Sequence, residues 1–209
     1  RWRQNYTSVS QAISVIEPEV IRRRQPQTMA DALGLSGKVF IQKSQQGGGS
    51  PMIRGFATNR LVYSVDGIRM NTAIFRSGNI QNVINLDPFS MQRSEILFGP
   101  SSVMYGSDAI GGVMSFETLT PEFALESVRN IFNPIASGKA IIRGISANNE
   151  RTGHLNVQLG WNKWAWLGSI SRWQYGHLRQ GSNGPEDYVK NYYVDDWQGT
   201  SQLLINGQV

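Results

Sequence analysis

The 209-residue chain contains no cysteine and only two histidines, His154 and His177. Without cysteine there is neither a disulfide framework nor a thiolate metal site. Two histidines leave little material for a histidine metal centre, and neither lies in the first half of the chain, so no Ser–His–Asp group is expected. We therefore expect no metal site, no cofactor and no enzymatic activity.

Charge is also scarce. Charged residues make up 17% of the chain, and the net charge of +5 is spread along it. Arg22, Arg23 and Arg24 form its one basic cluster, and a solvated helix end explains such a cluster better than a nucleic-acid surface does. We expect no nucleic-acid partner. At 10% aromatic residues, the composition does not suit a disordered chain either.

Long apolar runs are missing as well. No run approaches the roughly 18 residues of a transmembrane helix, and no apolar signal segment opens the chain. Membrane strands stay possible, because a β-barrel crosses a bilayer without such a run. The opening residues, RWRQNYTSVS, lack an initiator methionine and suggest a processed or trimmed N-terminus.

What is present, up to about Thr118, is a mixture of short apolar runs and helical patterns. Strands are predicted at AISVI, VFIQ, LVYSV, SEILF and GVMSFET, and helices after Pro18 and after Thr28. Thr28 suits an N-cap position, because its hydroxyl can accept a backbone N–H bond. Asp66-Gly67 is a strong signal for a tight hairpin. This part is predicted to be a small mixed α/β domain.

The glycine-rich segment 93–118, RSEILFGPSSVMYGSDAIGGVMSFET, raises the question of nucleotide binding. It contains no lysine for a Walker-type loop, and its glycines do not have the dinucleotide-binding spacing. We expect these glycines to permit tight turns or the close approach of another part of the chain.

From about Gly138 the pattern changes to long alternating strands, separated at one point by a predicted two-residue turn at Asn162-Lys163. In residues 153–161 one face carries Leu155, Val157, Leu159 and Trp161, and the other carries His154, Asn156 and Gln158. A lone histidine on such a face is more often a hydrogen-bonded filler than a ligand. Long strands with alternating faces are typical of an outer-membrane barrel, although a soluble sandwich alternates too.

Residues 8–118 resemble the plug domain of TonB-dependent outer-membrane receptors. Three motifs carry the resemblance in chain order: Ile53-Arg54-Gly55-Phe56, Val65-Asp66-Gly67, and SEILFGPSSVMYGSDAIGGV from Ser94 to Val113. The resemblance implies an α/β plug domain over residues 1–120, a linker over 121–137, and the first antiparallel strands of a transmembrane β-barrel over 138–209. The last part offers four strands at most, whereas the family barrel has 22. We therefore expect this chain to be an N-terminal part of a longer receptor, without the TonB box that lies just upstream of the plug in the family.

The resemblance also implies a function. Such a receptor lies in the outer membrane of a Gram-negative bacterium, in contact with its lipid, and imports a scarce small-molecule substrate, here an iron-siderophore or haem. Its plug blocks the barrel until TonB, energised by ExbB and ExbD, pulls on the receptor. The alternative is a soluble α/β binding or adhesion module without transport activity. The apolar face of Leu155, Val157 and Leu159 argues against that alternative.

Candidate site residues follow from the same resemblance. Polar plug loops are expected to bind substrate through Gln45, Gln46, Asn71, Phe75, Arg76 and Asn79, although packing of these loops against the barrel explains them equally well. Arg54 and Glu95 are expected at the contact between plug and barrel, with Arg54 paired to a barrel carboxylate beyond residue 209. The family commonly has a second arginine where this chain has Phe98, so of the two family arginines only Arg54 is carried over.

Overall fold

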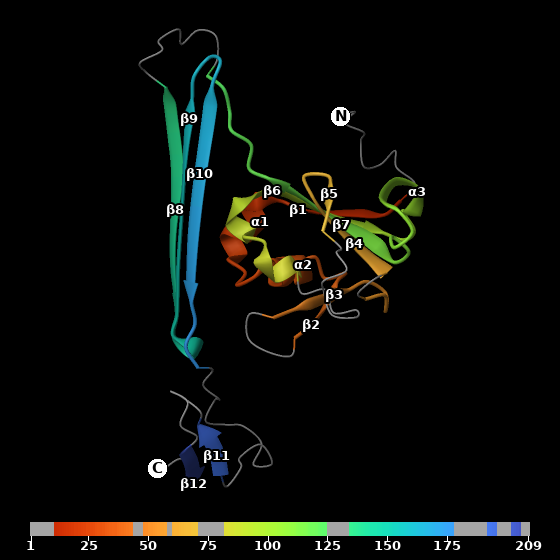
Figure 1. Cartoon of the computed structure of the whole chain (residues 1–209), viewed down its shortest axis with the longest axis vertical. Helices are drawn as coiled ribbons and strands as arrows, with labels where there is room; N and C mark the ends of the chain where they lie inside the picture. Colours follow the sequence, from red (N-terminus) through yellow and green to blue (C-terminus); the bar gives the residue numbers. More distant parts are fainter. Residues whose placement is uncertain are drawn as a thin grey trace.

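The computed structural model of the chain describes residues 11–43, 48–57, 60–70, 82–124 and 134–177, with two further strands at 192–195 and 202–205. These residues form a mixed α/β domain and, beside it, a set of long antiparallel strands (Figure 1). No helix in the described ranges has the length and apolarity needed to cross a membrane.

The α/β domain is built on a five-stranded sheet in the order β1-β6-β7-β4-β5. Its strands are β1 Ile13–Ile16, β6 Met91–Phe98, β7 Gly112–Thr118, β4 Leu61–Val65 and β5 Ile68–Arg69. The pair β4–β7 is parallel and the other three pairs are antiparallel. The predicted mixed α/β domain is therefore confirmed.

Short helices complete this domain. They are α1 Pro18–Arg24, α2 Met29–Gly34 and α3 Ser102–Tyr105, with 3-10 turns η4 Asn82–Asn85 and η5 Pro88–Ser90. Thr28 caps α2 as predicted: its hydroxyl accepts from Asp31 N, and the Asp31 carboxylate accepts from Thr28 N. Residues of helices α1 and α2 pack with the sheet in one apolar core. Its fully buried members include Met29, Leu33, Tyr63, Ile96, Met114 and Phe116.

Two further sequence predictions concern the backbone. Asp66 and Gly67 both have positive φ, at 51° and 84°, and form the predicted turn between β4 and β5. In the glycine-rich segment, a Cβ at Gly111 would lie 2.4 Å from the Phe56 Cβ, and one at Gly112 would lie 2.6 Å from the Leu97 oxygen. These glycines permit close packing, as expected. The predicted strand VFIQ is present as β2 Phe40–Gln42, paired with β3 Ser50–Met52.

The remaining described residues form β8 Ile135–Ile145, β9 Glu150–Gly160, β10 Ala165–Gln174, β11 Tyr192–Asp195 and β12 Gln202–Ile205. We call the three-stranded sheet β10-β9-β8 the wall. Trp161 N donates to Trp164 O (2.7 Å), which closes the predicted two-residue turn at Asn162-Lys163. Two expectations differ from the structure. There are five strands rather than at most four, and β8 begins at Ile135, within the range expected to be linker.

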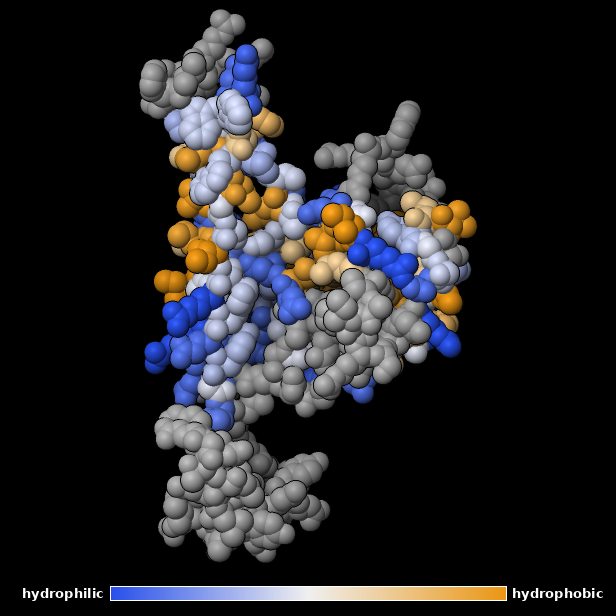
Figure 2. Space-filling view, in the orientation of Figure 1, coloured by the Kyte–Doolittle hydropathy of each residue, from blue (hydrophilic) through white to orange (hydrophobic). Residues whose placement is uncertain are grey.

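The wall has two unlike faces. On its outer face, which points away from the α/β domain, Ile142 is 90% exposed and Leu155 is 47% exposed. On its inner face, Arg143, Thr152 and His154 are buried. The predicted division of β9 into an apolar and a polar face is thus confirmed for Leu155, Val157 and His154. Figure 2 shows the apolar residues gathered along the upper part of the wall, with hydrophilic residues below them.

Candidate functional site

The α/β domain meets the wall through buried polar groups, and the first group surrounds Arg143 on β8. The Arg143 Nε donates to Glu150 Oε1 on β9 (2.9 Å), and their side chains are only 7% and 0% exposed. Thr152, directly opposite Arg143 in the β8–β9 register, donates its hydroxyl to the same carboxylate oxygen (2.7 Å). The hairpin register therefore brings an ion pair together on the inner face.

This Arg143 cluster binds the end of helix α1. The Arg143 Nη1 donates to the carbonyl oxygens of Gln25 (2.6 Å) and Pro26 (3.0 Å), just where α1 ends. A helix C-terminus carries partial negative charge, so a guanidinium is favourable there. From the other side, Gln27 Nε2 donates to Glu150 Oε2 (2.5 Å). Since all three guanidinium nitrogens have acceptors, the buried charge is fully hydrogen-bonded.

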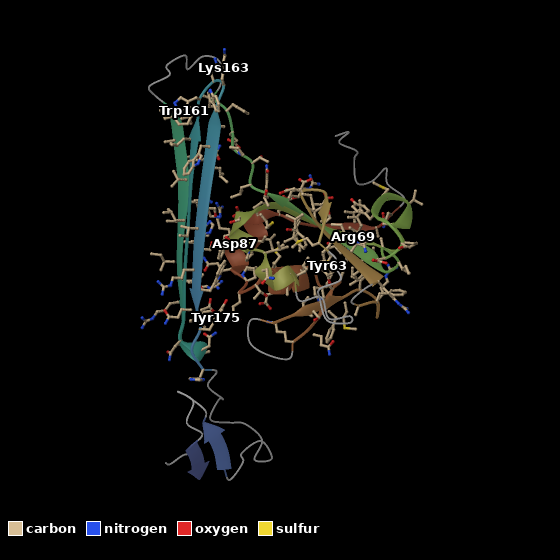
Figure 3. The ribbon with its side chains drawn as sticks, in the orientation of Figure 1. Tyr63, Arg69, Asp87, Trp161, Lys163 and Tyr175 are labelled. Atoms are coloured by element: carbon tan, nitrogen blue, oxygen red, sulfur yellow. The ribbon has the colours of Figure 1, made fainter. Side chains whose placement is uncertain are left out.

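A second group surrounds Asp87 at the start of η5 (Figure 3). Its carboxylate caps η5 by accepting from Phe89 N (2.9 Å) and Ser90 Oγ (2.6 Å). The same carboxylate also accepts from the hydroxyl of Ser171 on β10 (2.6 Å). The hydroxyls of Ser90 and Ser169 lie 2.9 Å apart, which adds a second bond to β10. Asp87 therefore holds η5 together and joins it to the wall.

His154 completes this Asp87 cluster, and it corrects one expectation. Its Nδ1 lies 2.6 Å from Ser171 Oγ and 3.3 Å from Asp87 Oδ2, so the chain does bring a serine, a histidine and an aspartate together. In a hydrolase triad, the serine and the carboxylate bind opposite ring nitrogens. Here both lie at Nδ1, and Ser171 donates directly to Asp87. The predicted hydrogen-bonded filler role of His154 is confirmed.

Phe89 connects the two clusters. Its ring centroid lies 5.4 Å from that of His154, and the Arg143 guanidinium carbon lies 5.9 Å from the same Phe89 centroid. Nearby, just past the end of β10, burial raises the pKa of the Tyr175 phenol, and the Glu150 carboxylate acts in the same direction. Tyr175 therefore keeps its phenolic proton at physiological pH.

A third contact lies where the chain passes from the α/β domain to the wall. Ala124 N donates to Trp161 O (3.1 Å), and a Cβ at Gly160 would come within 2.4 Å of the Glu122 oxygen. Residues 122–124 thus cross directly over the end of β9. Only glycine at position 160 leaves room for this crossing.

Most of the predicted substrate-binding residues cannot be placed. Gln45, Gln46, Asn71, Phe75, Arg76 and Asn79 lie outside the described residues, and their role remains a prediction. Arg54 lies in an exposed turn at φ 48°, and Glu95 on β6 pairs with Arg93 (2.7 Å). Among the described residues, neither forms a hydrogen bond to the wall. The partner predicted for Arg54 lies beyond residue 209, so this contact also remains a prediction.

The residues that do join the two parts were not among the predicted ones. Part of the signal was present in the sequence, because Glu150, Thr152 and His154 alternate along β9 and share its polar face. The partners on the α/β domain gave no such signal. Asp87 and Gln27 acquire their roles only through contacts with residues 84 and 123 positions away.

Comparison with known proteins agrees with this architecture. Residues 6–113, just over half of the chain, match the family described as TonB-dependent Receptor Plug Domain. The chain is 35% identical over 133 residues to the vitamin B12 transporter BtuB of Vibrio vulnificus (strain CMCP6), covering 61% of this chain and 21% of that protein. It is 29% identical over 131 residues to a hemin receptor of Yersinia pestis, covering 60% of this chain and 19% of that protein.

The similarity in fold extends past the α/β domain. The crystal structure of the siderophore receptor PiuA from Acinetobacter baumannii aligns with a TM-score of 0.59 at 21% identity, covering 83% of this chain and 22% of that one. The chain spans about a fifth of the length of these relatives. From the matched family and the shared fold, this chain belongs to the TonB-dependent receptor plug domain family, and its plug is followed by strands of the receptor barrel.

Proposed function

We propose that this chain is the plug and first barrel strands of an outer-membrane transporter of a Gram-negative bacterium. The transporter imports an iron-siderophore or haem and is driven by TonB with ExbB and ExbD. The observation that carries the proposal is the kind of contact between plug and wall. Buried hydrogen bonds from both the Arg143 and the Asp87 clusters join them.

These contacts suit a plug that has to move and return. At the Arg143 cluster, the wall supplies both members of the ion pair, Arg143 and Glu150, whereas the plug supplies only carbonyl and amide groups. At the Asp87 cluster, the plug supplies the carboxylate, and the wall supplies the hydroxyls of Ser169 and Ser171 and the ring of His154. Moving the plug away therefore exchanges hydrogen bonds with water without pulling Arg143 from Glu150.

The magnitudes favour the same interpretation. A hydrogen bond to a charged group contributes about 1.5–3 kcal/mol net when it is exchanged for one with water, and the bonds across the interface can be broken one after another. Separating a buried ion pair leaves an uncompensated charge and costs about 3–5 kcal/mol. An interface that requires no such separation is stable when no force acts on the plug, and its hydrogen bonds can form again after the plug has moved.

The outer face of the wall speaks against the alternative of a soluble module. Ile142, Ile170 and Trp166 are 90%, 68% and 53% exposed there. A soluble protein rarely exposes a continuous apolar surface of this kind, whereas the lipid-facing side of a membrane barrel requires one.

The proposed substrate class is based on the relatives and on one segment of the sequence. The relatives are named as a vitamin B12 transporter, a hemin receptor and a siderophore receptor, and the segment YGSDAIGG at 105–112 resembles iron-siderophore and haem receptors. Loops at 44–46 and 71–79 would contact the substrate from the plug, and Arg76 suits an anionic ligand.

The test is an uptake assay of the full-length receptor in an outer-membrane uptake-deficient strain, with and without TonB. Growth under iron limitation on ferric siderophores or haem is expected only when TonB is present. Uptake of cobalamin alone would overturn the substrate class. Uptake that does not require TonB would overturn the proposed mechanism.

A further inference from the structure

The outer face of the wall changes from apolar rows to rows that contain arginine at a defined position along the strands. The β8–β10 register places Ala136, Leu159 and Trp166 in one outward row, Gly138, Val157 and Gly168 in the next, and Ala140, Leu155 and Ile170 in the third. The fourth row is Ile142, Gly153 and Arg172, and the fifth is Gly144, Arg151 and Gln174. Three apolar rows are thus followed by two that contain arginine.

Arg151 and Arg172 are neighbours on this face. Arg172 lies opposite Gly153, and Arg151 lies two residues along β9, which makes the two arginines a diagonal pair about 7–8 Å apart. Both are exposed. None of the fifteen residues in the five outward rows is acidic, so the wall offers these two like charges no counter-ion on their own face.

The neighbouring positions leave space around them. A Cβ at Gly153 would meet nothing within 4 Å, and one at Gly144 would meet only the Glu150 oxygen at 3.9 Å. Glycine at both positions keeps the surface between the arginines low. The result is a basic surface just beyond the apolar band, and Figure 2 shows hydrophilic residues below the apolar ones at this end of the wall.

The position fits the boundary of a bilayer. From Trp164 to Arg172 the chain advances eight residues, or about 27 Å along the strand, which is about 20 Å across the membrane at the usual strand tilt of about 40°. The apolar band of a barrel is about 25 Å tall. The long stem of arginine lets its guanidinium reach past the last apolar row toward the headgroups.

The lengths of the connections between strands indicate which side of the membrane the arginine end of the wall faces. The tryptophan end of the wall carries the two-residue turn. The arginine end carries the four residues 146–149 between β8 and β9 and the 17 residues 175–191 between β10 and β11, which is the longest connection of the wall strands. Outer-membrane barrels have short periplasmic turns and longer extracellular loops. The arginine pair therefore belongs to the outer leaflet.

We propose that Arg151 and Arg172 bind the phosphate of an anionic lipid in the outer leaflet, next to the wall. This inference rests on the proposed outer-membrane function. Arginine binds phosphate through paired N–H donors, and two guanidiniums at this spacing can engage one phosphate from both sides. The lipid would then anchor the first barrel strands at a fixed depth.

The experiment measures lipid binding to the purified full-length receptor by native mass spectrometry. The probes are lipid A, lipid A without its phosphates, and inorganic phosphate. The R151Q/R172Q variant is expected to bind lipid A at least tenfold more weakly than the unmodified receptor. The matched control is R23Q/R24Q, which removes two exposed charges from the plug helix α1 and should leave binding unchanged.

Each outcome is decisive. Equal lipid A binding by R151Q/R172Q and the unmodified receptor would overturn the site, as would equal binding of the phosphate-free lipid. Displacement of lipid A by millimolar inorganic phosphate would replace the lipid site with one for a free anion. If R151Q/R172Q fails to form a barrel, the single variants R151Q and R172Q are measured instead, and each should bind lipid A more weakly than the unmodified receptor. Failure of the unmodified receptor to insert into the outer membrane would instead overturn the proposed function.

Discussion

The plug and the wall place their side chains by opposite rules. In the plug, large apolar and aromatic residues such as Met29, Leu33 and Phe116 are fully buried. In the wall, Ile142 and Ile170 point outward, while Arg143 and Glu150 are buried. The plug carries its own apolar core, whereas each face of the wall depends on what lies against it. The plug is a conventional domain, whereas the wall is a sheet with an apolar outer face and a polar inner face.

The difference also explains the chemistry of the interface. Because most of the inner face of the wall is polar, the plug binds it through carbonyl, amide and carboxylate groups, and Ile141 of β8 adds an apolar contact to the plug core. Such contacts keep the orientation of the plug well defined, since each requires a particular geometry. They also allow water to replace the plug when it moves.

The largest expected effect is on the wall's buried ion pair. Glu150→Ala should lower the stability of the folded receptor by about 3–5 kcal/mol, because it leaves Arg143 charged and buried without its partner. Chemical denaturation of the purified receptor measures this. The double variant Arg143→Met/Glu150→Leu is the control and should recover much of the loss. A single variant as stable as the unmodified receptor would show that the pair is solvated.

The next effect concerns the two faces of β9. Val157→Arg should destabilise the receptor by about 2–4 kcal/mol if the residue lies near the bilayer midplane, whereas Gln158→Arg on the inner face should be mild. Folding into lipid vesicles, followed by gel mobility with and without heating, measures both. Equal tolerance of the two substitutions would contradict the assignment of lipid and polar faces.

A smaller effect is expected at the Asp87 cluster. Ser171→Ala removes a donor from a carboxylate that is also held by Phe89 N and Ser90 Oγ, so about 1–3 kcal/mol of plug–wall interaction should be lost. Leakage of a large antibiotic through the outer membrane should rise. Ser169→Ala, which loses only the bond to Ser90, is the control and should leak less.

The smallest effect concerns substrate capture. Replacing Phe75 and Arg76 together with Ala should weaken substrate binding by about tenfold or more, since each aromatic or charge-assisted contact is worth roughly 1–2 kcal/mol. Binding of labelled substrate to whole cells measures this, beside an immunoblot of the receptor in the outer membrane. Unchanged affinity would assign capture to the barrel loops alone.

The sequence predicted local features well, since short-range chemistry determines them. The capping of α2 by Thr28, the turn at Asp66-Gly67 and the turn at Asn162-Lys163 each depend on a few adjacent residues. The start of β8 was missed because Ile135 to Gly138 shows no apolar alternation. Its strand conformation comes from pairing with β9, where Ile135 lies opposite Gly160.

The candidate site was harder to predict, because it depends on the docking of distant segments. Arg143 binds carbonyl groups more than a hundred residues earlier in the chain, and no local pattern indicates such a partner. The packing of Phe98 is a second feature that the local sequence does not indicate. The family often has arginine there, but in this chain the Phe98 ring is buried and Lys38 Nζ lies 5.7 Å from its centroid. The contact between Phe98 and Lys38 depends on the folded domain and could not be predicted from the sequence.

The central claim is that the plug leaves this part of the wall during import. The chain has no cysteine, so Ser90→Cys and Ser169→Cys introduce a single possible disulfide at a point where the two hydroxyl oxygens are 2.9 Å apart. In the oxidised double variant, TonB-dependent uptake of siderophore or haem should stop while substrate binding persists, and reduction should restore uptake. Uptake at the unmodified rate with the disulfide closed would contradict the account.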